Sequence, residues 1–157
     1  MAIPTQGTHT LVLYRSGERA DAALRSVCER ARDGASRVTV VALARQEAAP
    51  NGCCDTRSVL WNEVCRELAN EDLSRASRAV GNQAGVEFQV LAAPDRKVVD
   101  AIEREALTRG ADEIVLADPR GSGLGRLERR RLLRRSAIPI AAERERAELF
   151  DQSSASS

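Results

Sequence analysis

The chain has 157 residues, of which 43% are hydrophobic, and this is enough for one folded domain with a substantial core. The formal net charge is only +1, so no overall field favours binding to nucleic acid or to a membrane surface. No apolar run approaches the roughly 20 residues that span a bilayer, and residues 1–9 lack a secretory signal pattern. These features predict a cytoplasmic protein whose four cysteines stay reduced.

The first part of the chain predicts two strands separated by a helix. Residues 10–14 and 38–43 are short apolar runs, which are typical of strands covered on both faces in a parallel sheet. The helix between them is expected to have Ser16 as its N-cap and to end at Gly34. Its apolar face has the i, i+3, i+4, i+7 spacing and consists of Leu24, Val27, Cys28 and Ala31.

The middle of the chain predicts a long loop, a long helix and a third strand. The loop covers residues 45–58 and is longer than most strand-to-helix connections. The helix is expected over residues 59–82, and the strand over residues 86–92. The helix residues expected to face the core are Leu60, Val64, Leu68, Ala76 and Val80.

The last part of the chain repeats the alternation. Asp95 is expected to cap a third helix that ends at Gly110, with an apolar face formed by Val98, Val99, Ile102, Ala106 and Leu107. A strand over residues 114–117, a glycine-rich turn, an arginine-rich helix over residues 126–135 and a strand over residues 138–142 follow. The alternation predicts an α/β fold over residues 1–142, an open doubly wound parallel five-stranded sheet with helices on both faces. Residues 143–157 are expected to form a charged, disordered tail.

Ligands of doubly wound sheets bind at the carboxyl ends of the strands, where the strand order reverses. The glycine-rich turn lies at that edge and contains Gly121, Ser122 and Gly123. Its backbone N–H groups could bind an anion, or the glycines could supply a flexible strand-to-helix connection that needs φ > 0, and the second interpretation is favoured.

Cysteines also lie at this edge. Cys53 and Cys54 are adjacent in the long loop, and Cys65 follows on the next helix. A redox pair or a metal site are alternatives, but adjacent cysteines lack the usual ligand spacing and no histidine lies nearby. Ordinary reduced thiols are therefore favoured, and no metal site is predicted. Cys28 is expected in the core.

The only histidine, His9, is predicted at the amino end of the first strand, at the opposite edge of the sheet from the crevice. No Ser-His or Cys-His couple can therefore be built at the crevice, which favours a binding module over an enzyme. Asp95 and Asp118 both lie on the crevice edge, where paired carboxylates can hold Mg²⁺ or act as acid and base. A helix cap and a turn residue are the favoured interpretations of these two aspartates.

Arginines are dense in the last helix, where Arg126, Arg130 and Arg134 share one face. A phosphate or RNA contact is one interpretation, but a solvated helix is favoured because no aromatic residues are interleaved for base stacking. Lys97 is the only lysine of the chain, so the abundance of arginine indicates composition bias and a single arginine carries little functional signal.

Three segments resemble the universal stress protein family, namely residues 10–24, 93–118 and 130–142. The most specific parts are the Gly110-Ala111-Asp112 turn before an apolar strand and the Ile-Pro-Ile ending at residues 138–140. The resemblance implies an adenine nucleotide alpha hydrolase-like sheet in the order 3-2-1-4-5 and a binding or regulatory role in a stress response. It also implies a homodimer in which Ile138 and Ile140 of the fifth, edge strand pair with a second copy.

ATP-binding members of this family carry an aspartate after the first strand, and a Gly-x-x-Gly pattern with a later Gly-Ser/Thr pair after the fourth. Here Arg15 stands in place of the aspartate, and arginines at residues 129–131 stand where the Gly-Ser/Thr pair belongs. The resemblance implies weak binding of ATP or another adenine nucleotide. Two alternative functions come from the residues themselves: a weak ATPase, which the glycine-rich turn permits, and a thiol-based sensor at Cys53 and Cys54. The implied cofactor-binding residues are Arg15, Ser16, Gly17, Gly121, Ser122 and Gly123.

Overall fold

The structure, a computed structural model, describes residues 7–34, 36–47, 56–118 and 122–142. The strands are β1 (His9–Leu13), β2 (Arg37–Gln46), β3 (Val86–Pro94), β4 (Glu113–Leu116) and β5 (Ile140–Ala142). The helices are α1 (Glu18–Asp33), α2 (Thr56–Val80), α3 (Val98–Arg109) and α4 (Arg126–Arg135), with a short 3-10 turn, η2 (Asp95–Lys97), before α3. The tail over residues 143–157, Gly121, Cys53 and Cys54 lie outside the described residues.

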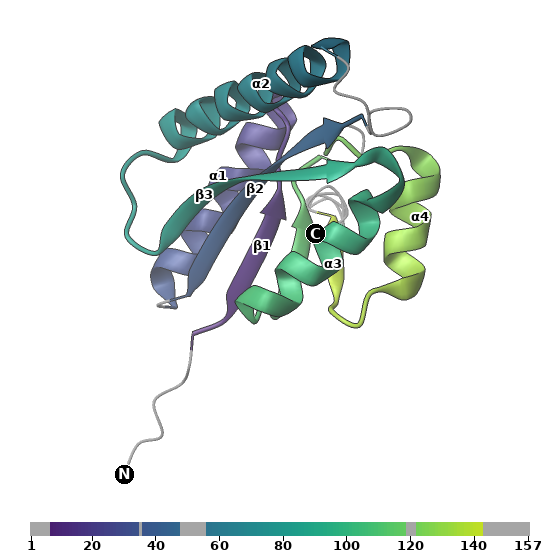
Figure 1. Cartoon of the computed structure of the whole chain (residues 1–157). Coiled ribbons are helices and arrows are strands. Elements are labelled where there is room, and N and C mark those ends of the chain that lie inside the picture. The colour runs from purple at the N-terminus through teal and green to yellow at the C-terminus, as the bar shows by residue number, and fades with distance from the viewer. Residues whose placement is uncertain (1–6, 35, 48–55, 119–121, 143–157) are drawn as a thin grey trace, which may run out of the picture.

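The strands form one parallel sheet in the order β3-β2-β1-β4-β5, which confirms the predicted topology. Helices α1 and α2 cover one face of this sheet, and α3 and α4 cover the other (Figure 1). The strand order reverses at β1, which has β2 on one side and β4 on the other. The connections that leave β1 and β4 therefore run in opposite directions from this point of the sheet. Within the described residues, no helix is both long and apolar enough to cross a membrane.

Each face of the sheet has its own core, because successive side chains of a strand point to opposite faces. In β1, Val12 packs on the α1–α2 side, whereas Leu11 and Leu13 pack on the α3–α4 side. All three are fully buried. The two cores are almost entirely aliphatic, as the low aromatic content of 3% predicts.

The amino edge of the sheet is closed by polar contacts around His9, far from the carboxyl ends of the strands. Its Nε2 lies 2.8 Å from Thr39 Oγ1 and its Nδ1 lies 3.0 Å from the Arg109 carbonyl. The His9 backbone N–H donates to the Asp112 carboxylate at 2.9 Å. Two residues before Asp112, Gly110 ends α3 with φ 66°, a left-handed conformation that favours glycine. The predicted Gly-Ala-Asp turn therefore connects α3 to β4, and its Asp112 accepts a hydrogen bond from β1.

The predicted core face of α2 is wrong in its first half. Leu60, Val64 and Leu68 are 56%, 45% and 55% exposed, and Val80 is half-buried. Of the predicted set only Ala76 is fully buried. The helix packs on β2 and β3 through another face. The buried side chains of that face are Ser58, Ala69, Leu73 and Ala76.

Three further predictions are corrected by the structure. Leu107 of α3 is 64% exposed, because it turns away from the core that holds its neighbour Ala106. Ser16 is not the cap of α1, since Gly17 holds that position and no side chain accepts a capping hydrogen bond. Asp95 begins η2 and caps no helix with its side chain, because its carboxylate is bound to Arg45.

Candidate functional site

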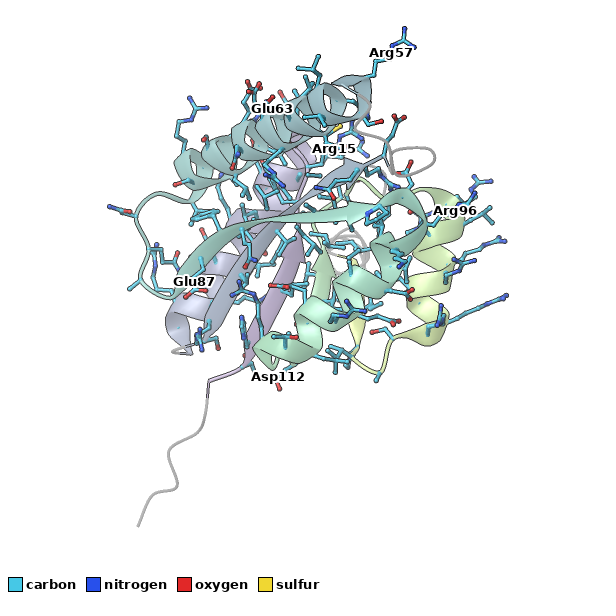
Figure 2. The ribbon with its side chains drawn as sticks, viewed as in Figure 1. Arg15, Arg57, Glu63, Glu87, Arg96 and Asp112 are labelled. Atoms are coloured by element: carbon cyan, nitrogen blue, oxygen red, sulfur yellow. The ribbon has the colours of Figure 1, made fainter. Side chains whose placement is uncertain are left out.

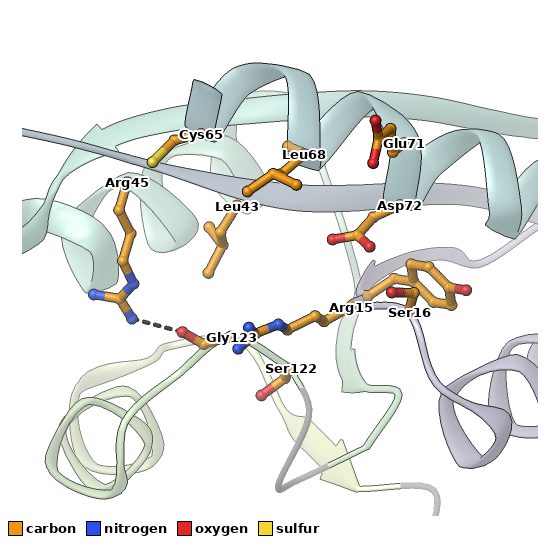
Figure 3. Close-up of a pocket in the computed structure, with 12 residues that line it drawn as sticks. Arg15, Ser16, Leu43, Arg45, Cys65, Leu68, Glu71, Asp72, Ser122 and Gly123 are labelled. Atoms are coloured by element: carbon orange, nitrogen blue, oxygen red, sulfur yellow. Dashed lines mark hydrogen bonds between the residues drawn. The ribbon is translucent and has the colours of Figure 1, made fainter. Parts of the chain in front are cut away.

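A cavity of about 400 Å³ opens at the carboxyl ends of β1 and β2, where the strand order reverses. Its size falls in the range typical of small-molecule sites. Figure 3 shows α2 forming one wall and the β4–α4 connection the opposite wall. It is lined by Tyr14, Arg15, Ser16, Leu43, Arg45, Cys65, Leu68, Ala69, Glu71, Asp72, Ser122 and Gly123.

The structure brings four of the six predicted site residues together. Arg15 and Ser16 come from the β1–α1 connection, and Ser122 and Gly123 come from the β4–α4 connection, more than 100 positions later. Figure 3 shows the Arg15 side chain extending across the cavity toward Gly123. Gly17 instead serves as the N-cap residue of α1 and does not line the cavity.

The β4–α4 connection contains a glycine in a left-handed conformation and a buried polar side chain. Gly123 has φ 86°, a left-handed conformation in which a larger side chain is strained. Ser122 is 1% exposed, and its hydroxyl has no hydrogen-bond partner in the described part of the chain. The positive φ of Gly123 agrees with the favoured interpretation of this turn as a connection that needs glycine.

Arg45, at the end of β2, joins three separate parts of the crevice. Its guanidinium donates to Asp95 Oδ1 at 3.0 Å, to the Gly123 carbonyl at 2.6 Å, and to both oxygens of Glu128 at 2.5 and 3.0 Å. The hydrogen bond to Glu128 is the main cause that raises the pKa of Arg45 above its ordinary value. Arg45 is therefore a fixed cation that holds β2, η2 and the start of α4 in one arrangement.

Glu128 occupies the N-terminus of α4 with its own carboxylate. Its Oε1 accepts the backbone N–H of Gly125 at 2.9 Å, the reciprocal contact of a capping box. Burial would raise the pKa of Glu128, but hydrogen bonds from Arg45 and Gly125 outweigh burial and lower it. The α4 N-terminus, which would attract a phosphate through its free N–H groups and dipole, already binds an internal anion.

The α2 wall of the cavity carries negative charge. Glu71 and Asp72 line it, and Figure 3 shows Asp72 projecting from α2 on the side where Arg15 enters the cavity. Tyr14 is not free to act there, because its hydroxyl donates to the buried Asp21, which also lies 3.4 Å from Arg75. Burial, and then this hydrogen bond, raise the pKa of Tyr14 above its ordinary value. The cavity thus offers one projecting cation and two carboxylates.

The described cysteines differ in environment. Cys28 lies in the core, as expected, and burial raises its pKa to about 11. Cys65 is half-buried and lines the cavity. The predicted thiol pair at Cys53 and Cys54 falls outside the described residues. Among the residues that the structure describes, no group of three His, Cys, Asp or Glu side chains could hold a metal ion.

Sequence reasoning missed Arg45 and Glu128. Arg45 follows directly on an apolar strand at the crevice edge, a position that marks a candidate site residue, but composition bias had reduced its weight. For Glu128 the signal was the spacing Gly125-x-x-Glu128 at a helix start, which fits the capping-box position N3. The acidic pair on α2 gives no comparable signal, since exposed helices commonly carry such residues.

Comparisons of sequence find no match, either among models of known families or among curated proteins. Comparisons of structure find several. UspA from Lactobacillus plantarum is 15% identical with a TM-score of 0.66, covering 86% of this chain and 96% of the other. A universal stress family protein from Burkholderia pseudomallei is 21% identical with a TM-score of 0.58, covering 89% and 98%.

A third similar structure is the universal stress protein from Archaeoglobus fulgidus in complex with dAMP. It is 21% identical with a TM-score of 0.57, and the match covers 87% of this chain and 96% of the other. At these identities the likeness concerns the fold. The chain therefore has the fold of universal stress proteins, in agreement with the resemblance of its sequence segments.

Proposed function

We propose that this chain is a universal-stress-type binding module whose crevice holds a small adenine nucleotide without binding ATP tightly. The observation that carries the proposal is Arg15, which projects into a cavity of about 400 Å³ at the point where the strand order reverses. Solved structures of the same fold include complexes with dAMP, cAMP and AMP. The same resemblance supports a regulatory role in the stress response, in the cytoplasm.

Weak binding of ATP follows from the charges that surround the cavity. A triphosphate seated at the start of α4 would have to displace the Glu128 carboxylate from Gly125 and from Arg45. It would also bring its charge toward Glu71 and Asp72 on α2. A monophosphate can instead use Arg15 alone, as a charge-assisted contact.

The proposal is tested by calorimetric titration of the protein with AMP and with ATP at fixed ionic strength. We expect AMP to bind with a higher affinity than ATP, and ATP to bind with a dissociation constant above millimolar. The variant Arg15→Ala should lose AMP binding by about tenfold, the effect of losing one charge-assisted contact of about 1.4 kcal/mol. Arg96→Ala, an exposed arginine that does not line the cavity, is the matched control. Micromolar ATP binding, or equal AMP binding by Arg15→Ala, would contradict the proposal.

The proposal includes a homodimer through β5. β5 is an edge strand of the described sheet, in which it pairs with β4 on one side. The Ile114 N–H donates to the Pro139 carbonyl at 2.9 Å, so in the parallel ladder the N–H and C=O of Ile140 point away from β4. Such an edge is suited to pairing with the same strand of a second copy across a two-fold axis.

A further inference from the structure

The first half of α2 carries a row of large apolar side chains that are about half exposed in the described part of the chain. Leu60, Trp61, Val64 and Leu68 are 56%, 53%, 45% and 55% exposed. Leu60 and Leu68 each lie four residues from Val64, and Trp61 lies three residues before Val64. These spacings place the four side chains on one face of the helix. We call this row the α2 stripe. Figure 2 shows this end of α2, marked by Arg57 and Glu63, standing at the periphery of the molecule.

The α2 stripe is separate from the face with which α2 packs on the sheet. That face is formed by Ser58, Ala69, Leu73 and Ala76, all buried. An amphipathic surface helix usually presents one apolar face, whereas α2 has a second one, of which Leu68 also lines the cavity. Four side chains at about half exposure present on the order of a few hundred Å² of apolar surface, the size of the largest apolar patch on a typical monomer, and such patches are often functional.

We propose that the α2 stripe binds the α2 stripe of a second copy of this chain, antiparallel, around a two-fold axis that passes beside Val64. In such a pair, positions equally distant from Val64 on either side lie level with each other. Leu60 and Leu68 are each four residues from Val64, so each leucine of one copy lies level with the other leucine of the second copy. Leu60, Val64 and Leu68 are thus self-complementary under this symmetry, whereas Trp61, three residues before Val64, lies level with Glu67 of the second copy.

The charges at the two ends of the stripe select the antiparallel arrangement. Arg57 and Glu71 lie seven residues before and seven residues after Val64, on the same face of the helix. In the antiparallel pair each Arg57 lies level with Glu71 of the second copy, at both ends. A parallel pair would instead set Arg57 beside Arg57 and Glu71 beside Glu71, which is repulsive. Together with Trp61, Val64 and Leu68, these positions have the 4-3-4-3 spacing of a coiled-coil seam.

The contact is expected to be reversible. A standard stable interface buries about 1,600 Å² in total, and two stripes supply less than that. Dimerisation should therefore depend on protein concentration. Leu68 and Glu71 also belong to the cavity wall, whereas Val64, Leu60 and Arg57 do not line the cavity. Variants at these three positions therefore separate association from ligand binding.

The position of the two-fold axis is tested by disulfide cross-linking. Val64→Cys is placed in a background in which Cys53, Cys54 and Cys65 are replaced by serine, so that Cys28, which is buried, is the other thiol present. Because Val64 meets its own copy at the axis, mild oxidation should give a covalent dimer. Asn70→Cys is the matched control, since it is exposed on another face of the same helix. Absence of the Val64→Cys dimer, or equal cross-linking of both variants, overturns the proposal.

The charge pairs are tested by reversal. Arg57→Glu and Glu71→Arg should each weaken the dimer at least fivefold in sedimentation equilibrium, and the double variant should restore it. Trp61 is the only tryptophan of the chain, so its emission should shift to the blue as concentration rises, and this shift should follow the same order among the variants. A double variant as weak as the single ones, or an emission independent of concentration, contradicts the proposal. Unchanged thermal unfolding of each variant at low concentration confirms that the monomer stays folded.

Discussion

At the scale of single residues, the crevice is organised by one arginine that contacts groups far apart in the chain. Arg45 reaches Asp95, 50 positions away, and Glu128, 83 positions away. These contacts keep the phosphate-attracting end of α4 neutralised and fix the Gly123 carbonyl. Arg45, which by sequence alone carries little functional signal, therefore fixes the arrangement of the crevice edge.

Replacement of Glu128 by glutamine tests this arrangement through pH. The pKa of Glu128 is lowered in the folded protein, so its ion pair stabilises the fold above the ordinary value of 4.5 and the contribution is lost as pH falls through the folded pKa. Urea unfolding should show Glu128→Gln to be less stable than the parent by about 1 kcal/mol at pH 7. The difference should shrink at pH 3. A difference that is the same at both pH values would refute the assignment, and Glu63→Gln on exposed α2 is the control.

The same carboxylate should also control ligand choice. If Glu128 occupies the place of a phosphate, Glu128→Ala frees the N–H of Gly125 and the guanidinium of Arg45 for an external anion. Calorimetry should then show ATP binding several-fold more tightly to Glu128→Ala than to the parent. Adenosine, which carries no phosphate, serves as the control and should bind both proteins equally. ATP affinity that is unchanged or reduced would show that the carboxylate is only a helix cap.

At the scale of elements, α2 shows why a periodic pattern does not by itself identify the core face. Its large apolar residues at Leu60, Val64 and Leu68 satisfy helical spacing, yet the sheet is contacted by Ala69, Leu73 and Ala76. Small side chains let the helix approach β2 and β3 closely. The same helix then has enough length to carry a second, outward face.

Close packing of α2 predicts a large penalty for added volume. Ala76 is 0% exposed within the α1–α2 core, so Ala76→Leu has no space for three more carbon atoms. Urea unfolding should show a loss of about 1–3 kcal/mol, as overpacked cores do. Val59→Ala, at a position that is 59% exposed and off the α2 stripe, should change stability by less than about 0.5 kcal/mol. A tolerated Ala76→Leu would mean that the helix can move away from the sheet.

At the scale of the whole molecule, the two proposed contacts between copies lie on different elements. β5 is at one edge of the sheet, and α2 covers β2 and β3 toward the other edge. Each contact is two-fold symmetric, so a chain that uses both assembles beyond a dimer, whereas a chain that uses one stops at two copies. The assembly state therefore reports how many of the two surfaces are active.

Ile140→Asp addresses the β5 contact. Ile140 is half-buried and packs on the α3–α4 core, so the substitution should weaken pairing through β5 and also lower monomer stability. Sedimentation at tens of micromolar should show the parent above its monomer mass of 17.0 kDa. Ile140→Asp should lose the species formed through β5 and keep the Val64→Cys cross-link. Ile140→Val, which preserves packing, is the control; a parent protein that sediments only at 17.0 kDa removes the β5 dimer.

The sequence by itself determined the order of elements, the parallel sheet and the bounds of α4, since each rests on local signals: apolar runs, glycines at helix ends and helical spacing. It also placed His9 correctly at the edge opposite the crevice. Only the tertiary structure decided which face of α2 is buried, because two apolar faces compete and packing distance selects the smaller side chains. The Arg45–Glu128 pair was likewise decided by the fold, since a contact across 83 positions has no local signature in either segment.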